Sequence, residues 1–238
     1  MVHRHPHSQS ARRPKIPLNP SGEGTLRFFL REAISLKTKR AFTRLATLFG
    51  ILGPGLFGFV LASLTLLEYG FMRSLGWDPF SAPTRDWPSG LALGPSGGLM
   101  TATFLFSGAS LSFFALGLRN ELPNARLGII LLALAGLALM GLAFSTDPTL
   151  RTTPPTWHGR LHDLSFVMLG LALMPGMLAL SLAFRHDPRW ANLAFYTLAT
   201  ASLALPAFFI KGPAFYVFLA AILAWCEVIA LRLWNLSR

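Results

Sequence analysis

The stretch TDPTLRTTPPTWHGRLHD, residues 146–163, is a short polar connection between two strongly apolar segments. His158 and His162 are four residues apart in it, and Asp163 follows directly. If the helix of the second apolar segment begins at Trp157, both imidazole rings lie on one helical face, one turn apart. Other ionisable residues are thinly scattered along the apolar part of the chain, so we take this connection as the centre of its organisation.

The composition predicts a protein that lives in a membrane. The 238 residues are 53% hydrophobic and 13% charged, whereas roughly 25% of residues are charged in an average soluble domain. A soluble fold of this length would need more polar residues to cover its surface. We therefore predict an all-α, polytopic integral membrane protein. The single cysteine, Cys226, excludes an internal disulfide.

Six apolar segments are each long enough for a helix to cross the hydrocarbon layer, which takes about 20 residues. We expect them to form a bundle of six transmembrane helices within residues 41–238, and no cleavable signal precedes them. The six spans are placed at about 44–67, 95–118, 127–145, 163–184, 190–210 and 213–234.

The N-terminal region is basic. The formal net charge is +11, and ten of the 21 Lys and Arg residues fall in the first 44 positions. Residues 1–24 have almost nothing to bury and are expected to be a disordered tail, while residues 25–40 have the spacing of an amphipathic helix in the headgroup layer. The alternative for 25–40 is a cytosolic extension of the first span. Anionic lipids are the expected partners of the tail, and nucleic acid is not.

The basic residues also predict an orientation. With the N-terminus inside, the inner segments hold sixteen Lys and Arg residues and the outer loops hold five. We therefore predict a multi-pass protein of the cell (cytoplasmic) membrane, a bacterial inner membrane, with both termini in the cytoplasm. The two longer loops, residues 68–94 and 146–162, then face outward together.

The histidine pair suggests a metal site. His158 and His162 at this spacing can share one divalent ion such as zinc. Gly159 follows the first histidine, so the HExxH pattern and its general base are absent. A catalytic ion would need a third ligand, and the candidates on the same side of the membrane are Asp163, Asp147, Glu68 and Asp86.

The same residues also have an architectural interpretation. Thr156 can cap the following helix, with Trp157 anchored at the interface. His158 and Asp163 would then hydrogen-bond the outer loops together, and Asp147 would end a helix or begin a turn. We favour this loop architecture, or ligand recognition by it, over metal binding.

Two carboxylic acids fall in or near the spans. Glu227 lies about two turns from the inner end of the last span, where an acid is costly without a partner. We favour a hydrogen-bonded packing role for it over a transport site. Glu68 lies at the outer edge of the first span, within reach of the histidine loop. An ion-coupled carrier would have several ionisable side chains spaced across the bilayer, and this sequence does not have them.

The run AFSTDPTLRTTPPTWHGRLHDLSFV, residues 143–167, resembles the signature of an uncharacterised bacterial family, domain of unknown function 998. The matching elements are an Asp-Pro at 147–148, a TWHG turn at 156–159 and a His-Asp at 162–163. The runs GILGPGLFG (50–58) and RHDPRW (185–190) are also similar to the family. The resemblance covers about residues 41–238 and implies six spans, but it implies no activity.

Three functions stay open at this point. The first is a non-enzymatic membrane protein that binds a lipid, a small solute or a membrane partner, including another copy of itself, through its outer loops. Its candidate ligand-binding residues are Glu68, Asp147, Trp157 and Glu227. The second is a metal-dependent hydrolase or transferase for lipid headgroups at the outer leaflet. The third is a small-solute transporter built on the proline-broken spans. We favour the first.

Overall fold

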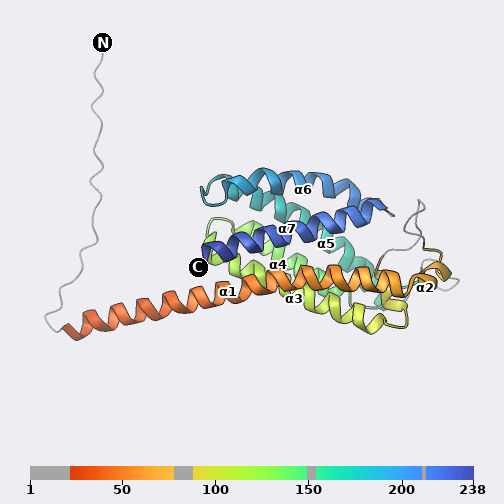
Figure 1. Ribbon diagram of the computed structural model, residues 1–238, viewed down its shortest axis with the longest axis horizontal. Coiled ribbons are helices and arrows are strands. Elements are labelled where there is room, and N and C mark those ends of the chain that lie inside the picture. The colour runs from red at the N-terminus through yellow and green to blue at the C-terminus, as the bar shows by residue number, and fades with distance from the viewer. Residues whose placement is uncertain (1–21, 78–87, 149–153, 211–212) are drawn as a thin grey trace, which may run out of the picture. The chain divides into compact units, whose positions relative to one another are not determined.

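The fold is known from a computed structural model that describes residues 22–77, 88–148, 154–210 and 213–238. All regular structure in these ranges is helical (Figure 1). In chain order the elements are α1 (Gly22–Leu67), α2 (Tyr69–Ser74), the 3-10 helix η1 (Pro88–Leu93), α3 (Gly97–Glu121), α4 (Arg126–Gly141), α5 (Trp157–Arg185), α6 (Ala191–Phe209) and α7 (Pro213–Leu236).

Five helices in the described ranges, α1, α3, α5, α6 and α7, are long and apolar enough to cross a membrane. The predicted class, an all-helical chain with several membrane-spanning helices, is thereby confirmed. The count of six is not. The third predicted span, residues 127–145, corresponds to α4, which has only 16 residues. At about 1.5 Å per residue it measures roughly 24 Å, less than the ~30 Å of hydrocarbon.

The N-terminal region differs from the prediction in one respect. Residues 25–40 are helical, but their helix does not stop there, because α1 runs without a break from Gly22 to Leu67. Of the predicted tail, residues 1–24, positions 1–21 lie outside the described residues. The chain divides into two compact units, residues 1–38 and residues 39–238, and the second contains all the other helices.

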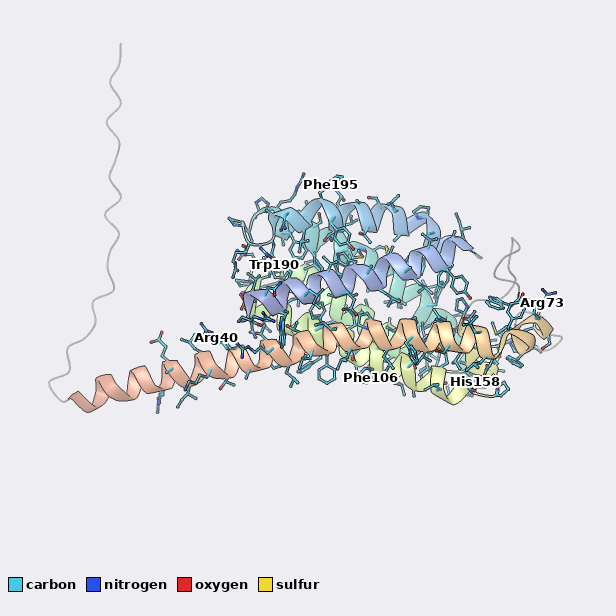
Figure 2. All side chains as sticks on the ribbon, in the orientation of Figure 1. Arg40, Arg73, Phe106, His158, Trp190 and Phe195 are labelled. Atoms are coloured by element: carbon cyan, nitrogen blue, oxygen red, sulfur yellow. The ribbon has the colours of Figure 1, made fainter. Side chains whose placement is uncertain are left out.

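Within residues 39–238, successive helices pack side by side. Helix α4 packs against α3 and α5, α6 packs against α5 and α7, and α3 also contacts α7. The helices run alternately up and down, so that α2 lies at one end of the bundle and the C-terminus at the other (Figure 1). His158 and Arg73 lie at the first end, and Trp190 lies at the second (Figure 2). We call the end at which α2 and His158 lie the histidine end, and the end at which Trp190 and the C-terminus lie the arginine end.

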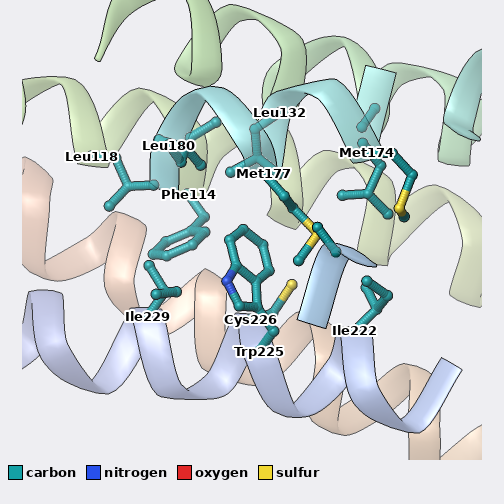
Figure 3. Packing of buried hydrophobic residues seen from close by; sticks show 14 of the residues in the cluster. Phe114, Leu118, Leu132, Met174, Met177, Leu180, Ile222, Trp225, Cys226 and Ile229 are labelled. Carbon is teal, nitrogen blue, oxygen red and sulfur yellow. The ribbon is translucent and has the colours of Figure 1, made fainter. Parts of the chain in front are cut away.

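Large buried side chains fill the bundle between the helices. Trp225 of α7 is fully buried, and its indole N–H donates to the hydroxyl of Thr197 on α6 at 3.0 Å. Around it gather Phe114 of α3, Met177 of α5 and Cys226 of α7 (Figure 3). The indole satisfies its polar atom inside the bundle, so this packing leaves no unpaired donor at Trp225.

The helices approach most closely where glycines face one another. A Cβ atom on Gly108 of α3 would lie 2.5 Å from the carbonyl oxygen of Gly136 on α4. A Cβ atom on Gly136 would in turn lie 2.6 Å from the carbonyl oxygen of Gly108. The two backbones are therefore in direct contact, which small residues allow between membrane helices.

An ion-pair cluster ties the helices together at the arginine end. The guanidinium of Arg189, in the α5–α6 connection, contacts Glu121 Oε2 at 3.0 Å and Asp187 Oδ2 at 2.9 Å. The backbone carbonyl of Arg189 accepts a hydrogen bond of 2.9 Å from Nε of Arg232 on α7. The hydrogen bond from Arg189 lowers the pKa of Asp187 below its usual value, and the same contact raises the pKa of Arg189.

This cluster predicts a pH dependence of stability. The pKa of Asp187 is lowered from 3.8 in the folded protein, so its contribution is fully present above pH ~4 and is lost as the pH falls through the lower folded value. In thermal unfolding between pH 6 and pH 2.5, the difference between wild type and Asp187→Asn is expected to shrink below pH 4. Arg189→Gln should remove the same difference, and a constant difference at every pH would contradict the assignment.

Candidate functional site

His162 is bound to the end of the helix that precedes its own. Helix α4 ends at Gly141, and the last carbonyl groups of a helix have no partner within it. Nδ1 of His162 lies 3.1 Å from the carbonyl oxygen of Leu142 and 2.9 Å from that of Phe144. Both partners are acceptors, so Nδ1 carries the proton and donates it. Nε2 is therefore the nitrogen that His162 leaves available.

His158 takes part in a hydrogen-bond chain that ends on Asp147. The hydroxyl of Thr156 donates its one proton to Asp147 Oδ1 at 2.7 Å. Nδ1 of His158 lies 2.8 Å from that hydroxyl oxygen and 3.2 Å from the carbonyl oxygen of Ser145. With the hydroxyl proton already engaged, Nδ1 of His158 must be the donor. Both histidines thus use Nδ1 to hold the chain that follows α4.

The same threonine starts α5. Thr156 is the N-cap residue, and its side chain accepts a hydrogen bond of 3.1 Å from the backbone N–H of Gly159. Its own backbone N–H donates to Asp147 Oδ2 at 2.9 Å. The predicted cap at Thr156 and the predicted helix start at Trp157 are confirmed. Gly159 is required here, because a methyl group on it would collide with the carboxylate of Asp147.

The structure does not bring the predicted metal ligands together. Among the described residues, no group of three or more His, Cys, Asp and Glu side chains is arranged to hold an ion. Both His158 and His162 are engaged through Nδ1, and Asp163 is exposed. Asp86, the last of the proposed third ligands, lies outside the described residues. The described contacts therefore favour the architectural interpretation of this loop and give no support to a zinc hydrolase.

Of the other predicted ligand-binding residues, Glu68 and Glu227 contact other parts of the chain, and Trp157 lies beside His158. Glu68 is buried. Its Oε1 accepts a hydrogen bond of 2.6 Å from the backbone N–H of Ser96, and its Oε2 has no hydrogen-bond partner among the described residues. Glu227 is half-buried against Gly55 of α1. Trp157 is 68% exposed, and the centroid of its ring lies 5.5 Å from the centroid of the His158 ring. An exposed ring at a span end is typical of an interfacial anchor.

A cavity lies directly inside the histidine end. It has a volume of about 110 Å³ and is lined mainly by aromatic and aliphatic side chains from α1, α3, α4, α5, α6 and α7. Its polar lining comes from both outer loops and the start of α5, namely Ser89, Thr146, His162 and Asp163. Residues of the two loops therefore meet at one site, which the sequence left open.

A second cavity continues deeper into the bundle. It has a volume of about 80 Å³ and reaches Pro54 of α1 and Cys226 of α7. The residues that line both cavities are Phe57, Leu139, Leu169, Phe218 and Leu219. We call the two cavities together the chamber. It is polar at the His162 end and apolar along the rest of its length.

The residues that form the chamber walls were not predicted from the sequence. Phe218, Leu219, Ile222 and Cys226 of α7 all line the deeper cavity, and their spacing of three or four residues puts them on one helical face. That apolar stripe was visible in the sequence. The same pattern, however, occurs on a membrane helix whether the stripe faces lipid, another helix or a cavity. Only the packing of α7 against its neighbours distinguishes these cases.

A family model described as "Protein of unknown function (DUF998)" matches residues 58–233. No curated protein and no solved structure matches the chain. The match covers α3, α4, α5, α6 and most of α7, together with the histidine connection between α4 and α5, whereas the chamber-lining residues of α1 precede it.

Proposed function

Because the chain belongs to the DUF998 family, as its motifs predicted, and the description of that family names no activity, we propose from the geometry that the protein binds an amphiphilic lipid in the chamber. One observation carries the proposal: the chamber is apolar along its length and has its polar groups at one end. Binding sites for small molecules have this character, with a few placed polar groups in an apolar wall.

The size of the chamber restricts the ligand. Its two parts measure about 110 and 80 Å³. An apolar cavity of about 150 Å³ lined by Leu, Ile and Phe holds one benzene molecule. The chamber therefore suits one short acyl or isoprenoid segment, and the rest of a longer chain, like the second chain of a two-chain lipid, would have to lie outside it.

The polar end restricts the headgroup. With Nδ1 of His162 donating to the end of α4, the nitrogen left for a ligand is Nε2, an acceptor in the neutral ring. The carboxylate of Asp163, at the same end, also accepts hydrogen bonds. A headgroup that donates, such as a hydroxyl or an ammonium group, complements both. A phosphate without a donor does not.

We expect His162→Asn to separate recognition from architecture. The amide nitrogen of asparagine can replace Nδ1 as the donor to Leu142 and Phe144, but nothing replaces Nε2. Loss of one hydrogen bond to a buried headgroup corresponds to about a tenfold loss of affinity. Binding of 1-monooleoylglycerol to purified protein should therefore fall about tenfold, with little change in the midpoint of thermal unfolding.

His158→Asn is the matched control, because His158 belongs to the Asp147 chain and does not line the chamber. It should retain 1-monooleoylglycerol. Methyl oleate has the same chain without a donor, so its binding should be equal in wild type and His162→Asn. Equal binding of 1-monooleoylglycerol by wild type and His162→Asn would reject the proposed site.

We also propose that the chain crosses the membrane six times, through the five long apolar helices and through the shorter α4 between α3 and α5. Two observations support this count: α4 packs between α3 and α5, and successive helices alternate in direction. The excess of Lys and Arg in the segments predicted to lie inside, sixteen against five in the predicted outer loops, supports a cell-membrane location with both termini in the cytoplasm. A reporter inserted after Thr153 that is active in the cytoplasm would contradict this orientation.

A further inference from the structure

Helices α5 and α6 enclose two hollows on the surface of the bundle. The larger, of about 420 Å³, is lined only by apolar residues and glycine, among them Val167, Leu171, Leu178 and Leu205. The smaller, of about 290 Å³, is lined by Arg185 at the end of α5 and by Ala191, Ala194, Phe195 and Leu198 of α6. The larger hollow shares Phe166 and Phe208 with the first cavity of the chamber, but none of the polar groups of that cavity lines either hollow.

The helical register aligns the lining residues of both hollows along the seam between α5 and α6, and we call this seam with its two hollows the groove. On α5, Leu171, Leu178 and Arg185 follow one another at intervals of seven residues, which places them on one face. On α6, Leu198 and Leu205 are also seven residues apart. The groove therefore runs along the seam of both helices and ends at Arg185. From Leu171 to Arg185 it extends about 21 Å, at 1.5 Å per residue.

The walls of the groove are exposed and apolar. Phe195 is 78% exposed and lies on the edge of the bundle formed by α6 (Figure 2). Leu171, Leu198 and Leu205 are exposed as well. Apolar exposure alone is ordinary for a membrane helix, since lipid tails are as apolar as these side chains. The groove is distinguished by the charge at its end.

Arg185 is exposed and has no ion-pair partner among the described residues. Arg189, four residues later, contrasts with it, because Arg189 is held by Glu121 and Asp187. A guanidinium group that is not paired within the protein can bind a phosphate through two parallel hydrogen bonds. Its position at the last turn of α5 puts it where a membrane helix leaves the hydrocarbon.

We propose that this groove binds an anionic glycerophospholipid of the leaflet at the arginine end. The phosphate pairs with Arg185, and one acyl chain lies along the α5–α6 seam toward Leu205 and Leu171. The argument rests on charge and shape at this groove and does not depend on ligand binding in the chamber. The site would retain this lipid through purification and would prefer phosphatidylglycerol to phosphatidylcholine.

Native mass spectrometry of the full chain, released from detergent with added lipid, tests the proposal. Wild type is expected to retain phosphatidylglycerol about tenfold more than phosphatidylcholine. Arg185→Gln should abolish that preference, and Arg185→Lys should restore part of it, because it keeps the charge without the paired donors. Arg119→Gln is the matched control, an exposed arginine in the last turn of α3.

Other outcomes would overturn the proposal. If Arg119→Gln lowers phosphatidylglycerol retention as much as Arg185→Gln does, the preference reflects overall charge. If Arg185→Gln and wild type retain equal amounts, the groove is not the site. Stabilisation of wild type by inorganic phosphate alone, to the extent given by phosphatidylglycerol, would show an anion site that does not use the groove. Leu205→Trp, which narrows the groove but keeps Arg185, should lower retention of both lipids.

Discussion

Replacing Gly108 with alanine is expected to destabilise the protein by about 2–3 kcal/mol, the range of overpacking in a tight interior. The new methyl group would lie 2.5 Å from the carbonyl oxygen of Gly136 and 2.6 Å from the backbone nitrogen of Met140. Both obstacles are backbone atoms and cannot rotate away, so α3 and α4 would have to separate. Reversible unfolding in mixed detergent micelles measures the change in free energy.

Gly98 provides the control within the same helix. A Cβ atom on Gly98 would meet nothing within 4 Å, so Gly98→Ala should change the free energy of unfolding by no more than about 0.5 kcal/mol. The pair separates close packing from the general preference of helices for alanine, which acts in the opposite direction at Gly108. Equal effects of the two substitutions would show that the α3–α4 contact is looser than the structure has it.

The helical class and most helix positions were predictable because hydropathy is a local property of the sequence. The second span was placed at 95–118 and α3 covers Gly97–Glu121. The start of α5 at Trp157 was predicted from the Thr156 cap and confirmed. The continuity of α1 was not predicted, because a separate helix was placed at residues 25–40, although no glycine or proline occurs between residues 25 and 49.

The end of α4 was not predictable in the same way. The third span was extended to residue 145 because Leu142, Ala143 and Phe144 are apolar, but the helix ends at Gly141. The carbonyl groups of Leu142 and Phe144 turn to His162, which comes from a later helix. Hydropathy cannot report that contact, because it depends on how α5 packs beside α4.

The histidine pair shows the same limit at the level of the site. The spacing correctly put His158 and His162 one turn apart at the start of α5. It did not specify which nitrogen points where, and each Nδ1 is engaged by backbone or threonine oxygen atoms of the loop. The position of the chamber was harder still to predict, because its lining residues come from six helices whose packing the sequence does not specify. The residue types left a metal site open as the less favoured interpretation, and the contacts favour the architectural one, a cap at the start of α5.

Replacing Asp147 with alanine is expected to have the largest effect of any change at the histidine end, about 3 kcal/mol of destabilisation. The carboxylate accepts hydrogen bonds from both the backbone N–H and the hydroxyl of Thr156, and hydrogen bonds to charged groups contribute about 1.5–3 kcal/mol each. Its loss also frees the hydroxyl that orients His158. Asp163→Ala, at an exposed position in the second turn of α5, should cost less than about 0.5 kcal/mol.

A double-mutant cycle with Gly159→Ala tests whether Asp147 holds the start of α5. The methyl group of Gly159→Ala would displace the carboxylate of Asp147, so this substitution should be strongly destabilising in wild type. In the Asp147→Ala background the obstacle is absent, and Gly159→Ala should cost little. Residues in contact commonly show interaction energies of about 0.5–3 kcal/mol. Additive effects would mean that the carboxylate does not lie against Gly159, and the cap at the histidine end would have to be built in another way.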